Sequence, residues 1–381
     1  MDLMPASTRP SRRCSKCLLP DSLPGSQFDD RGECSWCRRG FPNYVPLGDD
    51  ALRVFLEQNR AKGSGADCLV AVSGGKDSAY ALMSLWRQFG MRVEAFTYVH
   101  DGLTDFALKN AKNVCRSLNI TLHLVSLPDQ VHLESFKDFF NVWVNSQQPL
   151  AAAMSCVACK HLHIMGTRLA KERRIPVVVW ATCPLEVPPF IPTQPENGGD
   201  ERSMGMLDLG LLMGKTMLCQ PEFRRAFLKH AHLCVLGCLA FRPDSGWLQR
   251  RYPSVSHLHY FRYCSWNKKQ MLDALRRDTP WTIPESVISD WHSDCLFFVL
   301  KEYMFQMMFG ASYTDAFLSN QIRHGILTRE DGLAELVRSK EFFAEEVPKT
   351  LEVLGLAHLR GKCDTSCFIA SVYGESSGDV S

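Results

Sequence analysis

The 381-residue sequence lacks a long uncharged hydrophobic run. A membrane-spanning helix needs about 20 consecutive apolar residues, and the nearest candidate, residues 295–310, is interrupted by Lys301 and Glu302. The first dozen residues also lack the apolar core of a secretory signal peptide. We therefore expect no membrane partner and a cytoplasmic location.

The sequence also carries little net charge. Its 43 Lys and Arg residues nearly balance its 41 Asp and Glu residues, which leaves a formal net charge of +2. A protein that holds an RNA substrate normally has a pronounced basic surface, so the balance favours a small-molecule substrate over a nucleic acid. The hydrophobic content of 45% is that of an ordinary globular protein, and the length predicts two or three structural units.

Cysteine, by contrast, is abundant, with 16 residues. In a cytoplasmic protein, cysteines are interpreted as metal ligands or reactive thiols before disulfides. Two C-x-x-C pairs lie near the N-terminus, with 16 residues between them: Cys14 and Cys17, then Cys34 and Cys37. This spacing is typical of a structural zinc site, and four thiolates around Zn²⁺ can fold a short segment. We predict a zinc ribbon over residues 14–45, preceded by a disordered segment 1–13. Four unligated cysteines are the alternative.

The most informative segment runs from Ser73 to Ser78 and reads Ser-Gly-Gly-Lys-Asp-Ser. It follows the apolar run 68–72 and precedes a helix-like stretch over 79–89. A strand, a glycine-rich turn and a helix form the layout of a phosphate site, because glycines let backbone N–H groups approach an anion and the helix N-terminus adds a favourable dipole. The segment is not a Walker loop, which requires G-x-x-x-x-G-K-[ST]. A turn that merely opens a helix is the alternative.

Every position of this segment matches the SGGxDS loop of the PP-loop ATP pyrophosphatases, and the chain resembles that superfamily. In that family the loop holds the β,γ-pyrophosphate of ATP while a substrate oxygen attacks the α-phosphorus, which leaves an adenylated substrate. The resemblance implies ATP and Mg²⁺ as cofactors, with Lys76 neutralising the leaving pyrophosphate and Asp77 positioning Mg²⁺. The nucleotide-binding residues that it implies are Ser73, Gly74, Gly75, Lys76, Asp77 and Ser78.

Strand-like and helix-like stretches alternate from residue 50 to residue 190. We expect strands at residues 68–72, 93–99, 121–126 and 177–181, and helices at 50–62, 79–89, 105–118 and 165–173. Such alternation predicts an α/β fold with a doubly wound parallel sheet and helices on both faces. The resemblance implies the same HUP-like fold. Ligands bind beyond the carboxyl ends of the strands, where we expect Ser73, the nucleotide-binding pair His100 and Asp101, and Cys183.

The remaining segments differ in composition. Residues 191–205 are rich in Pro, Gly and Asn and predict a flexible loop near the site. Residues 206–360 have mainly helical patterns, with aromatic residues concentrated between Tyr260 and Phe317, and we interpret them as a substrate-binding extension. Residues 361–381 are expected to form a tail.

A further C-x-x-C pair, Cys156 and Cys159, lies between the third and fourth expected strands and just before a helix. Thiols near a helix N-terminus have lowered pKa values and are candidate nucleophiles or metal ligands. The position resembles that of the pair in PP-loop tRNA thiolation enzymes, where the pair and a third cysteine carry a 4Fe-4S cluster or a persulfide. Packing of the pair at the helix start is the alternative. Candidates for the third cysteine are Cys183, Cys219, Cys234, Cys238, Cys264 and Cys295.

A second resemblance, to the N-acetyl sugar amidotransferases, covers most of the chain. It rests on the N-terminal cysteines, the loop, and three C-terminal motifs: Tyr263-x-x-Trp266, Ser289-Asp290-x-x-Ser293-Asp294-Cys295, and residues 319–330. In the last motif, Arg323 and Arg329 are candidate ligands of a phosphate or substrate anion, with surface ion pairs as the alternative. The chain departs from that family at residues 175–183, where polar Glu-Asn positions are lost and Cys183 is present, and at its central C-x-x-C pair.

These patterns predict an enzyme that adenylates a carbonyl or lactam oxygen of a small molecule, such as a nucleobase, and replaces it with sulfur. The expected partners are a cysteine desulfurase-like sulfur donor and a second copy in a homodimer. An N-acetyl sugar amidotransferase supplied with ammonia by a glutaminase subunit is the alternative, followed by tRNA thiolation and by a non-catalytic nucleotide-binding or zinc-scaffold protein. The expected catalytic residues are Lys76, Asp77, Cys156, Cys159 and Cys183.

Overall fold

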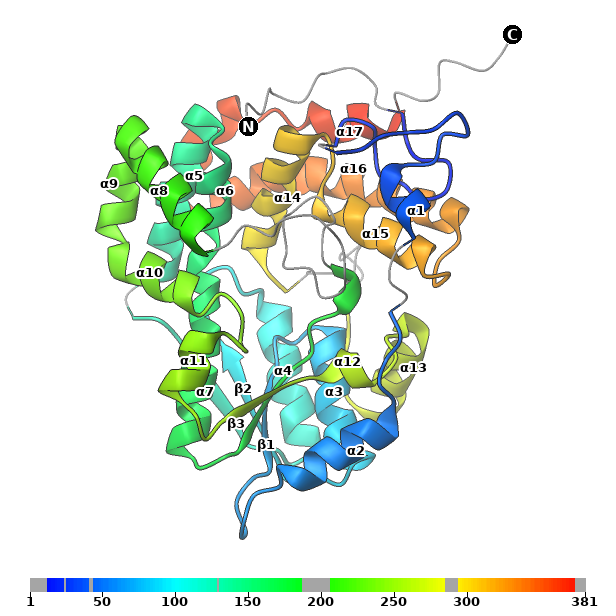
Figure 1. Ribbon diagram of the computed structural model, residues 1–381, viewed down its shortest axis with the longest axis vertical. Coiled ribbons are helices and arrows are strands. Elements are labelled where there is room, and N and C mark those ends of the chain that lie inside the picture. The colour runs from blue at the N-terminus through cyan, green and yellow to red at the C-terminus, as the bar shows by residue number, and fades with distance from the viewer. Residues whose placement is uncertain are drawn as a thin grey trace.

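The computed structural model describes residues 12–23, 25–40, 44–128, 130–186, 206–284 and 294–373, with only the backbone for 206–209 and 373. The parallel sheet and its covering helices form one half of the molecule, and a group of helices forms the other half (Figure 1). The N-terminal cysteine segment lies against the helical half, beside α15 (Tyr313–Arg323).

Five parallel strands form the sheet in the order β3-β2-β1-β4-β5. They span Leu122–Val125 (β3), Val93–Tyr98 (β2), Cys68–Ala71 (β1), Val177–Trp180 (β4) and Ser256–His259 (β5). In the central strand β1, Cys68 pairs with Val93 of β2 on one side and with Val177 of β4 on the other. The α/β fold with a parallel sheet that the sequence predicts is confirmed.

Strand β5 corrects the expectation that the sheet ends near residue 190. Its Ser256 pairs with Val177 of β4, although the strand lies within the segment 206–360 that was expected to be mainly helical. The strand has only four residues, and two of them are histidines. No run of apolar or β-branched residues therefore distinguishes it in the sequence.

The two faces of the sheet are covered by different helices. Cys68 and Val70 of β1 belong to the same core as the helices α3 (Lys76–Arg87) and α4 (Asp105–Ser117). Leu69 of β1 points to the opposite face and packs with residues of α7 (His161–Glu172) and α11 (Gly246–Arg251). From β1 the chain runs outward to β2 and β3 on one side, and it then returns to β4 on the other side of β1. The carboxyl ends of β1 and β4 therefore form the topological switch point at which such sheets bind ligands.

The helices of the sheet half lie where they were expected, although the ends of several of them differ; α7, for example, begins at His161 and not at residue 165. α2 spans Asp49–Gln58, and α3 begins at Lys76, earlier than expected, so that Lys76 and Asp77 lie in its first turn. Three elements between β3 and α7 were not expected. They are α5 (Val131–Ser146), α6 (Pro149–Ser155) and the 3₁₀ helix η1 (Val157–Lys160).

The helical half is built mainly from the C-terminal part of the chain. α14 (Leu296–Phe309), α15 and α17 (Ser366–Tyr373) pack against the long helix α16 (Arg329–Val353). α17 corrects the expectation that residues 361–381 are a tail. The predicted loop 191–205 and most of the predicted disordered segment 1–13 lie outside the described residues. The other elements are α1 (Ser35–Arg39), η2 (Pro184–Glu186), α8 (Met206–Cys219), α9 (Pro221–Lys229), α10 (Ala231–Leu239), α12 (Tyr260–Tyr263), α13 (Lys268–Asp278) and η3 (Ala357–Lys362).

A buried ionic network joins the N-terminal segment to the helical half. Asp315 of α15 accepts from Arg13 Nη1 at 2.7 Å and from Lys340 Nζ at 2.5 Å, and all three side chains have 0% exposure. Lys340 Nζ also donates to Gln306 Oε1 of α14 at 2.6 Å. Buried charges are tolerated only when they are paired in this way. The network therefore fixes the cysteine segment to three helices.

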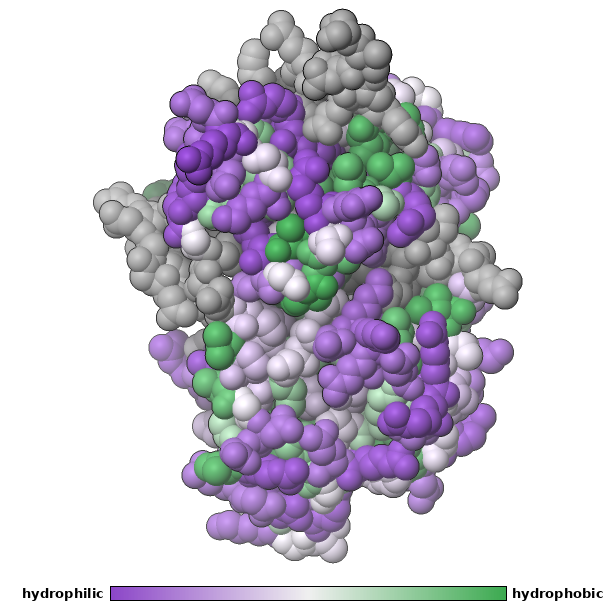
Figure 2. Space-filling view, turned by 90° about the vertical axis from the view of Figure 1, so that its right-hand side faces the viewer, coloured by the Kyte–Doolittle hydropathy of each residue, from purple (hydrophilic) through white to green (hydrophobic). Residues whose placement is uncertain are grey.

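The described helices include none that is long and apolar enough to cross a membrane. The most apolar long helix of the helical half, α14, buries Phe297 and Leu300 in the core. On the face shown in Figure 2, hydrophilic residues predominate and apolar residues form several small patches.

Candidate functional site

The loop between β1 and α3 lies at the switch point of the sheet. β1 ends at Ala71, Gly75 is the N-cap of α3, and the first backbone N–H groups of a helix have no partner within the helix. Gly74 has φ +91°, and a Cβ atom on it would lie 2.0 Å from the carbonyl oxygen of Ala107 in α4. Only glycine therefore fits at this position. The N-terminus of a helix is the kind of place at which proteins bind anions.

The two hydroxyl groups of the loop shape its backbone. Ser73 N donates to Ser78 Oγ at 3.2 Å, and Ser78 Oγ donates to Gly75 O at 3.2 Å. Gly75 N is 3.3 Å from Ser73 Oγ, which accepts from it. The sequence suggested these serines as direct phosphate ligands. In the structure both also form hydrogen bonds with backbone atoms of the loop and so fix its conformation.

Two tryptophans that follow residue 260 in the chain donate hydrogen bonds to the loop. Trp266 Nε1 donates to Asp77 Oδ1 at 2.6 Å, while Lys76 Nζ donates to Asp77 Oδ2 at 3.1 Å and lies 5.6 Å from the centre of the Trp266 ring. Lys76 is only 2% exposed, so its ammonium group sits in a largely dry environment. Trp281 Nε1 donates to Gly74 O at 2.9 Å. Trp281 was missed by sequence reasoning, and the concentration of aromatic residues after Tyr260 was the only signal.

A cavity of about 300 Å³ opens at the carboxyl ends of β2 and β3, at the lower end of the range for small-ligand pockets. Its lining includes Tyr98, His100, Asp101 and His132. Burial lowers the pKa of His100 to about 4, and burial also holds the pKa of His132 well below its usual range. Both imidazoles are therefore neutral at pH 7. The expected nucleotide-binding pair His100 and Asp101 thus lies on a concave surface.

The central cysteine pair lies behind this cavity. Cys156 is the C-cap of α6 and Cys159 belongs to η1. Cys159 Sγ is 3.4 Å from His132 Nε2, and His132 Nδ1 is 2.9 Å from Tyr98 Oη. The pair is therefore connected to a side chain of the cavity wall through a buried histidine.

Cys156 is the more acidic thiol of the pair. The hydrogen bond with Cys159 lowers the pKa of Cys156, burial opposes it, and the Lys301 ammonium of α14 lowers it further. The same hydrogen bond raises the pKa of Cys159. The sequence predicted a low pKa at a helix N-terminus, and Cys156 is the N-cap of η1 as well as the C-cap of α6. The causes of the lowered pKa are the partner thiol and Lys301. The thiolate is the nucleophilic form of cysteine.

Two consecutive residues before α14 join the loop to the cysteine pair. The Asp294 side chain hydrogen-bonds Ser73, and burial raises the pKa of this carboxyl group. Cys295 lies two residues before Phe297, whose ring centre is 4.8 Å from that of His132, and His132 is the side chain that Cys159 Sγ contacts. The backbone holds this segment beside the end of β2, because Thr104 N donates to Asp294 O at 3.0 Å. Cys295 is thus the candidate third cysteine that the structure brings to the pair.

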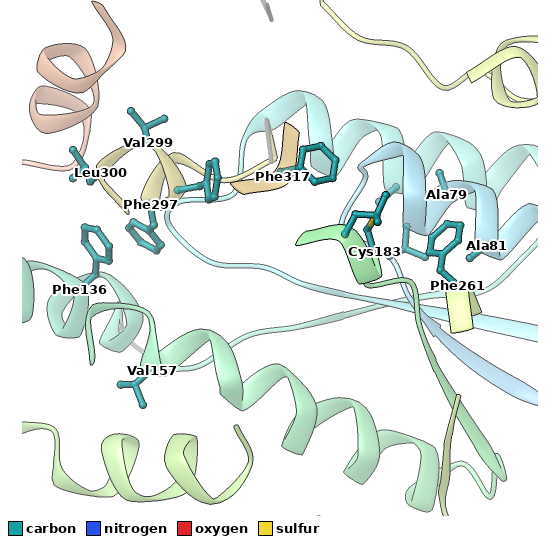
Figure 3. Packing of buried hydrophobic residues seen from close by; sticks show 14 of the residues in the cluster. Ala79, Ala81, Phe136, Val157, Cys183, Phe261, Phe297, Val299, Leu300 and Phe317 are labelled. Atoms are coloured by element: carbon teal, nitrogen blue, oxygen red, sulfur yellow. The ribbon is translucent and has the colours of Figure 1, made fainter. Parts of the chain in front are cut away.

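Cys183 occupies a different position. It follows β4, is 1% exposed, and lies beside Ala79 and Phe261, away from Val157 of the pair (Figure 3). Burial raises the pKa of its thiol, and the charges of Asp77 and Lys76 act on it. Cys183 therefore belongs to the surroundings of the nucleotide loop rather than to those of the cysteine pair.

Arg323 and Arg329, expected at a substrate anion, lie against the N-terminal segment. Arg323 Nη1 donates to Cys17 Sγ at 3.2 Å, and Arg329 Nε donates to the carbonyl oxygens of Cys14 and Cys17 at 3.2 Å. Four thiolates around a divalent cation leave a net negative charge, which explains two arginines beside them. These contacts of the two arginines are thus with the cysteine segment, and their role at a substrate anion stays a prediction.

The four N-terminal cysteines form the one group of three or more potential metal ligands found among the described residues. Their sulfur atoms lie within 4.8 Å of one another, and the pairs Cys14–Cys37 and Cys17–Cys34 are separated by 3.8 Å. A tetrahedral site with Zn–S bonds of about 2.3 Å places its sulfurs about 3.8 Å apart. Cys34 N donates to Cys14 Sγ at 3.2 Å. The predicted metal-binding cluster is confirmed as a geometry that fits Zn²⁺.

No family model and no curated protein matches the chain. Among solved structures, the chain is similar to NMN synthetase from Francisella tularensis, with 18% identity and a TM-score of 0.26 over 36% of this chain; it spans 54% of that protein. It is also similar to the U34-tRNA thiolase NcsA from Methanococcus maripaludis with its [4Fe-4S] cluster, with 13% identity and a TM-score of 0.31 over 97% of this chain and 94% of that one. Likenesses this weak carry no functional argument, so we interpret the site from its own residues.

Proposed function

We propose that this chain is an enzyme of the PP-loop ATP pyrophosphatase type, which transfers AMP from ATP to a carbonyl or lactam oxygen of a small molecule and releases pyrophosphate. The observation that carries the proposal is the segment Ser73–Ser78. Its sequence matches the family loop at every position, and its glycine turn presents the N-terminus of α3 at the switch point of a parallel sheet.

The residues of the crevice suit the parts of ATP. The N-terminus of α3 and Lys76 offer positive charge for the pyrophosphate, and Asp77 offers carboxylate oxygens of the kind that Mg²⁺ prefers. Bound Mg²⁺ would neutralise charge on the phosphates. The cavity lined by His100 and Asp101 lies beside the loop, because Asp294 hydrogen-bonds Ser73 of the loop and also interacts electrostatically with His100. This cavity would hold the nucleoside.

We further propose that sulfur replaces the activated oxygen. The support is the segment that begins with Asp294 and Cys295. Asp294 hydrogen-bonds Ser73 of the loop, and the Phe297 ring of the same segment lies 4.8 Å from the ring of His132, which contacts Cys159. Cys295 takes the place of Cys183 as the third cysteine in this proposal. A thiol pair with a further cysteine in the same segment would serve a persulfide carrier, and the iron content decides whether these thiols hold a 4Fe-4S cluster instead.

In the persulfide form, a cysteine desulfurase-like donor leaves one sulfur atom on the Cys156 thiolate. The terminal sulfur attacks the activated carbon, the carbon–oxygen bond breaks, and AMP leaves with the bonding electrons. Cys159 then attacks Cys156 Sγ, the bond between Cys156 and the transferred sulfur breaks, and the Cys159 proton passes to the departing product. The product thiocarbonyl is released, and the resulting Cys156–Cys159 disulfide is reduced by an external thiol.

Persulfide loading tests the sulfur proposal without knowledge of the substrate. The protein is incubated with a cysteine desulfurase and free cysteine, digested, and examined by mass spectrometry. We expect the Cys156 peptide to gain the mass of one sulfur atom, Cys156→Ser to abolish the gain, and Cys159→Ser to retain it.

Cys219, an exposed thiol, provides the matched control, and Cys219→Ser should load sulfur as the parent does. Loading that tracks Cys219, or no sulfur on Cys156 in anaerobically purified protein that also lacks iron and sulfide, would refute sulfur transfer. Ammonia would then be the nucleophile to test, with a glutaminase as its source.

A further inference from the structure

Helix α15 lies between the N-terminal cysteine cluster and the crevice. Asp315, Ser319 and Arg323 are spaced four residues apart and therefore share one face of the helix. This face holds the cysteine segment, because Asp315 pairs with Arg13, Ser319 Oγ accepts from Leu18 N at 3.1 Å, and Arg323 donates to Cys17 Sγ.

A second face of α15 meets the crevice through Phe317 and Asn320, which are three residues apart. Asn320 Nδ2 donates to Leu185 O at 2.7 Å, in the 3₁₀ helix η2 that follows β4 and Cys183. The Phe317 ring packs edge-on against Trp266, with ring centres 5.8 Å apart, and Trp266 in turn holds Asp77. One helix thus reaches both sides of the switch point.

The two faces are joined by a continuous chain of hydrogen bonds. Arg323 donates from Nη1 to Cys17 Sγ at 3.2 Å and from Nη2 to Asn320 Oδ1 at 2.5 Å, and Asn320 donates to Leu185 O. Asn320 is 1% exposed and Leu185 is 1% exposed, so water does not compete for the last bond. Arg329 binds the same cysteine segment but through the carbonyl oxygens of Cys14 and Cys17, from the start of α16.

We propose that α15 couples the metal-binding cysteine cluster to the nucleotide crevice, with Arg323 as a positioning residue for the turn that carries Cys183. The cysteine cluster then influences the position of the turn that carries Cys183, in addition to stabilising the N-terminal segment. The coupling itself rests on geometry, whereas its expected effect on ATP rests on the function proposed above.

The test compares Arg323→Met, Asn320→Ala, the double variant and Arg329→Met, all as full-length protein with bound metal. The first readout is the alkylation rate of Cys183, followed by mass spectrometry, because a buried thiol reacts only when its surroundings open. Loss of one buried hydrogen bond corresponds to about a tenfold change, so we expect about tenfold faster alkylation in each single variant. The double variant should equal Asn320→Ala, since residues in one chain of bonds are not additive.

Arg329→Met is the matched control and should alkylate at the parental rate, while metal content, measured by release to a chromophoric chelator, remains equal among all four. Where Arg323→Met loses its metal, Asn320→Ala decides, because it leaves the contact with Cys17 intact. Parental alkylation of Cys183 in Asn320→Ala would overturn the coupling, as would equal acceleration in Arg329→Met with metal retained.

The second readout is the Kd of a non-hydrolysable ATP analogue, which we expect to rise about tenfold in Arg323→Met and Asn320→Ala and not in Arg329→Met. A parent protein that binds no analogue would contradict the proposed function, and the alkylation rates would still decide the coupling. If the alkylation of Cys183 is accelerated but the Kd is unchanged, the cysteine cluster is coupled only to the turn that carries Cys183. That result would overturn the proposed effect on nucleotide binding.

Discussion

Gly74→Ala is expected to lower the rate of ATP cleavage by at least about 100-fold, because displacements of about 1 Å in a catalytic site have effects of this size. The added Cβ atom would lie 2.0 Å from Ala107 O, and the backbone has φ +91°. The loop must therefore move away from α4, which also breaks the hydrogen bond from Trp281 to Gly74 O. Formation of AMP from ATP measures the effect.

Gly65→Ala is the matched control for this variant. Gly65 lies in the turn before β1, and nothing lies within 4 Å of the Cβ atom that the substitution adds. We expect parental activity from it. Parental activity in Gly74→Ala, with the fold intact by circular dichroism, would mean that the loop does not hold the phosphates.

Asp315→Asn is expected to lower the free energy of unfolding by about 3–5 kcal/mol, since it leaves the buried cations Arg13 and Lys340 without their counter-charge. Chemical denaturation followed by fluorescence measures the change. Asp244→Asn is the control, because Asp244 pairs with Arg242 at the surface, where such a pair contributes about 0–1 kcal/mol. A change in Asp315→Asn no larger than in the control would contradict the network.

The same network predicts an acid dependence of stability. Burial alone would raise the pKa of Asp315, but Lys340 and Arg13 outweigh it, so the pKa lies below its usual range. A lowered carboxyl pKa contributes stability that is fully present above the unfolded-state value of about 3.9 and is lost as the pH falls towards the folded-state pKa. Asp315→Asn should therefore flatten the loss of stability below about pH 4.

Local patterns with fixed spacing were the features that the sequence could reveal. The segment Ser73–Ser78 and the four N-terminal cysteines are such patterns. In the structure the first forms a loop at the switch point, and the four cysteine side chains lie together as expected for a metal site. Strand β5 could not be found, because Ser256–His259 becomes a strand only through pairing with β4. Its own four residues carry no strand signal.

Contacts between distant segments explain most of what the sequence did not show. Trp281 and Asp294 reach the loop from about 200 residues away in the chain. Arg323 and Arg329 were recognised as functional candidates, but nothing in their local spacing indicates that they face Cys14 and Cys17. Likewise, several cysteines were equal candidates for the third position until the fold placed the segment of Cys295 and Phe297 against His132, which contacts Cys159.

The fate of ATP labelled at the α-phosphorus tests the central claim most directly. The protein is incubated with the labelled ATP and Mg²⁺, together with a small-molecule extract as a source of substrate, and the products are separated. The account predicts that the label appears as AMP, with pyrophosphate released in equal amount. Label in ADP, or ATP that is neither bound nor cleaved, would contradict it.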